Sequence, residues 1–180
     1  IPGDLSVSVM GDCSAQTGTD FTGEAAATFL DDCSSVSGEV TYSDEILDEI
    51  SLGCYTIART WTASATDGCG NTSIESGVQV IQVVDQMAPT ITLSSVEVAI
   101  ACDAWTCDMD VLTGLGFASW TDNCELDTAY IECEPMSGGC VGPVPTWDVE
   151  YIVVDACGNT ASAHQFILLV DTVAPTISIT

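Results

Sequence analysis

Two nearly identical six-residue motifs constrain this chain more than any other feature of its sequence. They read DGCGNT at 67–72 and DACGNT at 155–160. The segments that follow them also match, since SGVQVIQVVDQMAPTITL (76–93) corresponds to AHQFILLVDTVAPTISIT (163–180). The recurrence of the same motif and the same following segment in both halves of the chain indicates two copies of one domain. We therefore expect repeat 1 over residues 1–85, repeat 2 over 86–171, and a linker and donor-type strand, or the start of a next repeat, over 172–180.

The segments between these motifs are typical of β-strands. LSVSV, VQVIQVV and TITL alternate apolar with polar residues and are rich in Val, Ile and Thr. Gly, Asn, Asp and Ser separate them, as expected for turns. The fold class is therefore predicted as all-β, with two tandem antiparallel β-sandwiches. One exception is SDEILDEI (43–50), whose apolar spacing favours one or two helical turns.

Several short stretches carry a family resemblance. VTYSDE, RTWTASATDGCGNT, VVDQMAPT, WTDNC and VVDACGNTASA resemble hyalin-repeat (HYR) and related immunoglobulin-like repeats of large secreted and cell-surface proteins. The resemblance covers both repeats and implies immunoglobulin-like sandwiches with an adhesive or structural role outside the cell. It implies no catalytic residues. Repeat 2 departs from the pattern with two extra cysteines, Cys107 and Cys133.

The charge of the chain limits its partners. Its 27 acidic residues face a single basic one, Arg59, giving a formal net charge of −26. Phosphate backbones and anionic lipids would be repelled, so we expect neither nucleic acid nor acidic membranes as partners. The sequence has no run of 18 apolar residues, so we expect no membrane insertion. Arg59 is expected to pair with a carboxylate across a strand pair. The one histidine, His164, lies on a predicted strand and is expected to face solvent rather than to act in catalysis.

Ten cysteines in a repeated pattern favour disulfides and an extracellular or cell-surface location. An antiparallel meander would place Cys54 and Cys69 at opposite ends of one strand, roughly 33 Å apart, whereas a disulfide needs Cα atoms within about 7 Å. This reasoning predicts Cys13–Cys54, Cys33–Cys69 and Cys124–Cys157. For the remaining four cysteines it favours Cys102–Cys140 and Cys107–Cys133.

The sequence also contains candidate calcium ligands and one candidate glycosylation site. Asp67 and Asp155 should bond backbone amides in a β-hairpin turn, and the alternative is that they bind calcium with other carboxylates at strand ends. Asp85 and Asp171 are further calcium candidates, because they precede the link to the next repeat. No other cofactor is expected. Asn71 in NTS (71–73) is the one N-glycosylation sequon, and we expect it on an exposed turn.

The two ends of the chain suggest an assembly. Repeat 1 lacks the APTITL segment with which repeat 2 begins, and the chain ends in a spare copy, APTISIT (174–180). Either the chain is a processed or excerpted piece of a longer array, or the tail completes repeat 1 of another copy by strand addition. In the second account Ile177 and Ile179 would lie beside the strand containing Val7 and Val9.

These observations predict a structural building block of an extracellular fibre, a head-to-tail homopolymer. The main alternative is a calcium-dependent adhesin that binds a carbohydrate or protein receptor. A third interpretation is a non-catalytic module of a secreted enzyme.

Overall fold

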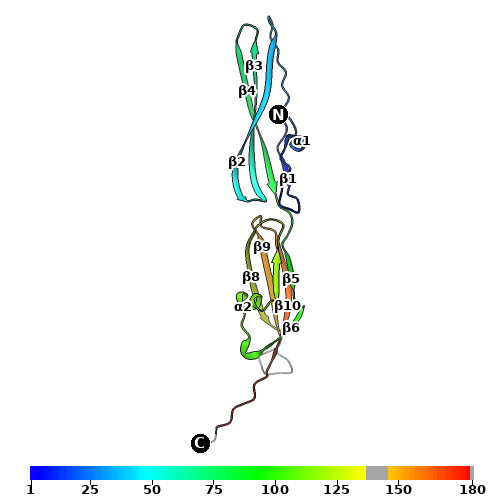
Figure 1. Ribbon diagram of the computed structural model, residues 1–180, viewed down its shortest axis with the longest axis vertical. Helices are drawn as coiled ribbons and strands as arrows, with labels where there is room; N and C mark the ends of the chain where they lie inside the picture. The colour runs from blue at the N-terminus through cyan, green and yellow to red at the C-terminus, as the bar shows by residue number, and fades with distance from the viewer. Residues whose placement is uncertain (137–145, 179–180) are drawn as a thin grey trace. The chain divides into compact units, whose positions relative to one another are not determined.

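The computed structural model describes residues 1–136 and 146–178. The chain divides into two compact units (Figure 1). The first contains Ile1–Gln86 together with Asn123–Glu125, and the second contains Met87–Asp122 and Leu126–Thr180. The division at Gln86 lies next to the predicted repeat boundary. The short piece 123–125, however, belongs to the first unit although it comes from the second repeat.

The first unit is built on one four-stranded sheet in the order β1-β4-β3-β2. Its elements are β1 (Leu5–Ser8), α1 (Thr19–Thr22), β2 (Val36–Ser51), β3 (Cys54–Asp67) and β4 (Thr72–Val84). Strands β2, β3 and β4 form an antiparallel meander, whereas β1 pairs in parallel with β4. The buried apolar residues of this unit alternate along the strands and include Val9, Ile57, Trp61, Ile81 and Val83.

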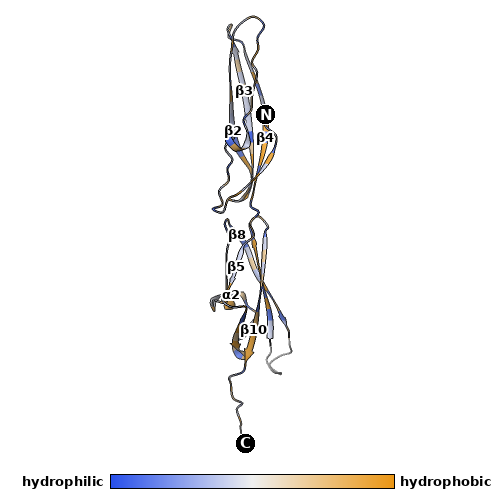
Figure 2. Cartoon of the chain, turned by 90° about the vertical axis from the view of Figure 1, so that its right-hand side faces the viewer, coloured by the Kyte–Doolittle hydropathy of each residue, from blue (hydrophilic) through white to orange (hydrophobic). Residues whose placement is uncertain are grey.

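The second unit has the same sheet plus a second, smaller one. Its larger sheet has the order β6-β10-β9-β8, and β5 pairs with β7 in a two-stranded sheet. The elements are β5 (Thr90–Leu93), β6 (Glu97–Ala101), the 3-10 turn η1 (Cys102–Ala104), α2 (Met109–Gly114), β7 (Ala118–Thr121), β8 (Leu126–Pro135), β9 (Thr146–Asp155) and β10 (Thr160–Val170). The apolar stretches of β4 and β10 appear in orange in Figure 2.

The core of the second unit lies between its two sheets. Ile91 and Leu93 of β5 pack against a buried cluster formed by Leu112, Ala118, Val149, Tyr151, Ile167 and Leu169. On β5, Thr90 and Thr92 are exposed while Ile91 and Leu93 are half-buried, as alternation along a strand requires. The strand β5 therefore covers the larger sheet with its apolar side.

The expected helical turns at 43–50 are wrong. These residues lie in β2 and pair with β3. The register shifts between Ile46 and Asp48 and again between Glu49 and Ser51. Such irregularities break the two-residue alternation of a strand, which explains why the apolar residues here have a helix-like spacing.

Candidate assembly site

The DxCGNT motifs form the predicted β-hairpin turns, β3–β4 in the first unit and β9–β10 in the second. In the first, Asp67 Oδ1 accepts from the amides of Cys69 and Asn71, both at 2.8 Å, and Oδ2 accepts from Asn71 Nδ2 at 2.7 Å. These bonds, led by the one from the Asn71 side chain, lower the pKa of Asp67. Gly70 follows with φ +90°, a conformation that favours glycine.

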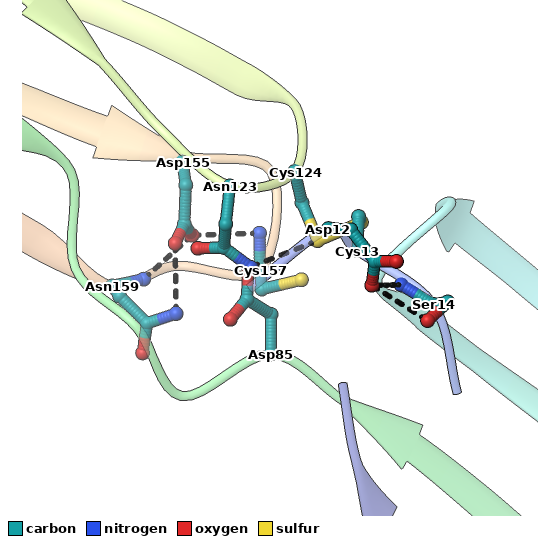
Figure 3. The surroundings of a disulfide bond; sticks show 9 residues. All are labelled: Asp12, Cys13, Ser14, Asp85, Asn123, Cys124, Asp155, Cys157 and Asn159. Carbon is teal, nitrogen blue, oxygen red and sulfur yellow. Dashed lines mark hydrogen bonds between the residues drawn. A yellow bond between two sulfur atoms is a disulfide. The ribbon is translucent and has the colours of Figure 1, made fainter. Parts of the chain in front are cut away.

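The second turn repeats this arrangement. Asp155 accepts from the amides of Cys157 and Asn159, at 2.9 and 2.8 Å, and from Asn159 Nδ2 at 2.7 Å (Figure 3). Asp155 is 1 % exposed. The carboxylates of Asp67 and Asp155 therefore hold their turns.

The four calcium candidates do not form a shared site within either unit. Asp67 and Asp85 lie just beyond opposite ends of β4, and Asp155 and Asp171 lie just beyond opposite ends of β10. Strands of 13 and 11 residues separate these carboxylates by roughly 35–45 Å. Asp85 is buried and accepts from Asn123 Nδ2 at 3.1 Å, and Asp171 accepts from the amide of Val173 at 2.9 Å.

In the second unit, the carboxylate of Asp122 lies near the calcium candidate Asp155. An oxygen of Asp122 lies within 4.8 Å of one of Asp155. Carboxylate oxygens are the ligands that calcium prefers, so calcium binding at Asp155 stays a prediction.

Two of the predicted disulfides are wrong because the sequence argument paired cysteines only within a repeat. Cys13 is joined to Cys124, which is 111 residues away (Figure 3). This bond replaces both Cys13–Cys54 and Cys124–Cys157. Cys124 is available to the first unit because residues 123–125 fold with that unit. Cys54 and Cys157 are also disulfide-bonded.

Among the other cysteines, one predicted disulfide is formed and another is not. Cys107 is joined to Cys133, the pairing that the sequence favoured. The predicted Cys33–Cys69 bond is not formed, and both residues are exposed thiols. Their loops nevertheless touch, since the amide of Gly68 donates to Ser34 Oγ at 3.1 Å. The predicted pairing of Cys102 with Cys140 involves a residue outside the described part of the chain.

Arg59 pairs with a carboxylate across two strands and His164 faces solvent, as the sequence predicted. Arg59 faces Asp44 across β2 and β3. His164 on β10 is about half exposed, and its Nδ1 lies 3.0 Å from Asp148 Oδ1. The hydrogen bond to Asp148 is the main cause that raises the pKa of His164. Asn71, the sequon residue, is exposed.

A buried glutamine in each unit was missed by the sequence reasoning. Gln79 and Gln165 each stand six residues before the aspartate that ends the strand, so the repeat itself contained the signal. Gln79 accepts from Trp61 Nε1 at 3.2 Å and donates to the Thr22 carbonyl at 2.8 Å. Gln165 accepts from Tyr151 OH at 3.0 Å and donates to the Ser95 carbonyl at 2.8 Å. Each unit thus contains the same kind of buried hydrogen-bonded glutamine.

These glutamines align the units and reveal a difference between them. Gln79 binds the carbonyl of Thr22, and Gln165 also reaches the carbonyl of Phe117, at 3.4 Å. The residues after Phe117 form β7, which pairs with β5. The residues that follow Thr22 belong to no strand, and in the described chain no strand pairs with them.

An open groove lies in the first unit along Ala25–Leu30, the segment that corresponds to β7 of the second unit. Phe29 anchors one wall, because its ring sits on Gly38 so closely that a Cβ there would approach it to 2.6 Å. Ile1 packs on Gly77 at one end. Two adjoining hollows, which share Ala27, Ala63 and Glu75, are together called the open groove. They are lined by Ala25–Leu30, by Val36 and Val40 of β2, by Trp61, Ala63 and Ala65 of β3, and by Glu75 of β4.

The floor of the open groove is built from small side chains. The aligned glutamines Gln79 and Gln165 pair with Arg59 and Val149 across the sheet, so Ala63 stands where the second unit has Val153. Val153 is fully buried, whereas Ala63 is only half-buried. This part of the β3 face is uncovered and has room for the larger side chains of an added strand.

Residues 174–178, the described part of the tail that matches β5, are exposed. After β10 the chain runs away from the second unit without regular structure (Figure 1). Val173 is 64 % exposed and Ile177 is 88 % exposed. In the APT alignment Ile177 corresponds to Ile91 and Ile179 to Leu93, the two residues with which β5 contacts the core of the second unit.

Comparison with known proteins adds no identification. No model of a known protein family matches the chain, and no curated protein matches it significantly. Within the described residues, no helix is long and apolar enough to cross a bilayer.

Proposed function

We propose that this protein is a structural building block of an extracellular fibre or cell-surface filament. Residues 174–180 of one copy would enter the open groove of the next copy as a strand. Each unit would then be an immunoglobulin-like sandwich of the hyalin-repeat type. The observation that carries the proposal is that one chain has an uncovered groove in its first unit and, in its tail, the sequence that fills the matching place in its second unit.

The second unit also indicates the pairing partner of the added strand. There β5 pairs with β7 and not with β6. The counterpart of β6 is β1, the strand that includes Val7, and it already pairs with β4. The acceptor in this proposal is therefore the segment Ala25–Leu30, rather than the strand containing Val7 and Val9 that the sequence favoured.

The energetics favour association. Burying Ile177 and Ile179 stabilises by roughly 3–6 kcal/mol before ordering costs. Backbone hydrogen bonds to the acceptor segment fix the register. The contact is heterologous, from tail to first unit, so repeating it produces a filament unless the rotation closes a ring.

The disulfides support the location. Oxidised pairs persist in oxidising compartments such as the extracellular space, and the structure holds Cys13–Cys124 and Cys107–Cys133. The strongly acidic surface keeps filaments apart in solution, because like charges repel.

The test is filament formation by purified protein, measured by negative-stain electron microscopy and sedimentation. The double variant I177D/I179D should stay monomeric, because it would place two charges in the groove. The matched control is T176D/S178D on the opposite face of the same strand, where β5 exposes Thr90 and Thr92; it should still polymerise. If I177D/I179D forms filaments of normal length, strand donation is wrong.

A further inference from the structure

The acceptor segment of the first unit can be aligned with β7 in two ways, which differ by four residues. Counted from the carbonyls that the buried glutamines bind, Ala118 of β7 matches Gly23. Counted from the motifs FLDDC (29–33) and WTDNC (120–124), Ala118 matches Ala27. The choice between them decides which residues of an incoming tail lie opposite which residues of the groove wall.

The backbone at Gly23 excludes the first alignment. Gly23 has φ +88°, whereas strand residues have φ of about −120° to −140°. Its amide donates to the Thr19 carbonyl at 2.9 Å, which ends α1. Gly23 therefore cannot take the place of Ala118, which pairs with β5. Residues 23–26 are extra in the first unit, and residues 27–30 correspond to β7.

The side chains of residues 27–30 agree with the second alignment. Phe29 matches Trp120, and both are half-buried aromatic residues. Ala27 matches Ala118, which pairs with β5 and is 6 % exposed. Ala27 itself is exposed, and within the described chain no strand pairs with its segment. The position that β5 covers in the second unit is therefore uncovered in the first.

The pairing of β5 with β7 can then be transferred to two joined copies residue by residue. Trp120 lies opposite Ile91 in an antiparallel ladder, and Ile177 is the tail residue that matches Ile91. We propose that Ile177 of one copy lies directly opposite Phe29 of the next, in one fixed register. This inference rests on the proposed function and narrows its acceptor segment to residues 27–30.

A tail displaced by two residues keeps its apolar side chains inward, because side chains alternate along a strand, but it fits less well. Displaced in one direction, it places Pro175 opposite Phe29, and the fixed φ of proline, about −65°, departs from that of a strand. Displaced in the other direction, it places Ile177 opposite Asp31. The carboxylate of Asp31 is exposed and accepts from the amide of Ser34 at 2.7 Å, so it offers no apolar cover.

The test is a disulfide between tail and groove wall in assembled filaments. Directly opposite residues have Cβ atoms about 5 Å apart, whereas diagonal neighbours are about 7–8 Å apart. In the proposed register Ser178 lies opposite Thr28. A protein carrying S178C is mixed in equal amounts with one carrying T28C, and the filaments are treated with oxidised glutathione. Both proteins also carry C33S and C69S, because these two thiols are exposed.

A second pair provides the matched control. In the same register Thr176 lies opposite Leu30, as the first pair of the β5–β7 ladder requires. T176C should therefore be joined to L30C but not to T28C. S178C should show the opposite preference. Glu24→Cys reports the excluded alignment, in which it faces residue 178.

Products are measured on a non-reducing denaturing gel and identified by peptide mapping after pepsin digestion, and electron microscopy records the filaments in every mixture. We expect filaments in which S178C is joined mainly to T28C. Filaments in which S178C is joined to E24C, prefers L30C, or is joined to none of these positions overturn the register. If neither the wild type nor the C33S/C69S parent forms filaments, the proposed function itself is wrong, and the register falls with it.

Discussion

Arg59 and Asp44 form a two-point ion pair across β2 and β3, with Arg59 Nε 2.7 Å from Asp44 Oδ1 and Nη2 2.8 Å from Asp44 Oδ2. Arg59 is 1 % exposed. It also donates to Thr22 Oγ1 at 2.6 Å and to the Thr17 carbonyl at 2.7 Å. The only guanidinium of the chain therefore holds the segment around α1, which precedes the wall of the open groove, against the sheet.

Asp44→Asn should destabilise the first unit, because it leaves a buried charge without its counter-charge. Removing one partner of a buried ion pair costs about 3–5 kcal/mol, and about 3 is expected since a third of the Asp44 side chain is exposed. The matched control is the neighbouring Glu45→Gln, an exposed site. Urea unfolding followed by tryptophan fluorescence measures both. Equal stability of the two variants would mean that Asp44 does not neutralise Arg59.

Gln165→Leu should destabilise the second unit by about 2 kcal/mol. It deprives the buried Tyr151 hydroxyl of its acceptor and the Ser95 carbonyl of its donor, and each unsatisfied buried group costs about 1–3 kcal/mol. Tyr151→Phe removes the hydroxyl itself and should cost about 1 kcal/mol. In the double variant the two losses should not add, since they share one bond. Strict additivity in chemical denaturation would show that Tyr151 and Gln165 act independently.

The repeat made much of this fold predictable. Equal turn chemistry at Asp67 and Asp155 located both hairpins, because Asp, Gly and Asn have few other local uses in that order. The alternation of the strands identified the all-β class. The cross-strand partner of Arg59 could be predicted in kind, since a chain with one cation and many carboxylates must neutralise it.

What could not be predicted depends on contacts between distant segments. Directions along the strands placed Cys13 and Cys54 at the same end, but nothing local shows that residues 123–125 fold with the first unit. The shift in strand register after Ile46 gives this strand a helix-like spacing of apolar residues, so the sequence pattern did not identify it as a strand. The acceptor segment Ala25–Leu30 has no alternating pattern, and only the pairing of β5 with β7 identifies it.

The pKa of His164 should lie above its usual 6.5, because Asp148 bonds the protonated ring. A folded-state pKa above the unfolded one stabilises at low pH, and this contribution is lost as pH rises through the folded pKa. His164→Gln should therefore lower the melting temperature more at about pH 5.5 than at pH 8.5. The single histidine gives one set of ring signals, so an NMR titration reads the pKa directly. A value at or below 6.5, or no change in Asp148→Asn, would contradict the assignment.

Filling the open groove should block assembly from the acceptor side. Ala63 lines the groove on β3, so Ala63→Phe would occupy the space that we assign to Ile177 or Ile179 of the incoming strand. The fold should tolerate it, since the groove is open and the added ring does not enter a close-packed core. Thr62→Phe, whose side chain lies on the other face of β3, is the matched control. We expect Ala63→Phe to melt within a few degrees of the wild type but to form no filaments, while Thr62→Phe polymerises. Because Ala63→Phe keeps an intact tail, it should still cap wild-type filaments and shorten them in proportion to the amount added. Normal growth of Ala63→Phe alone would exclude the groove as the acceptor, even if the tail proves essential.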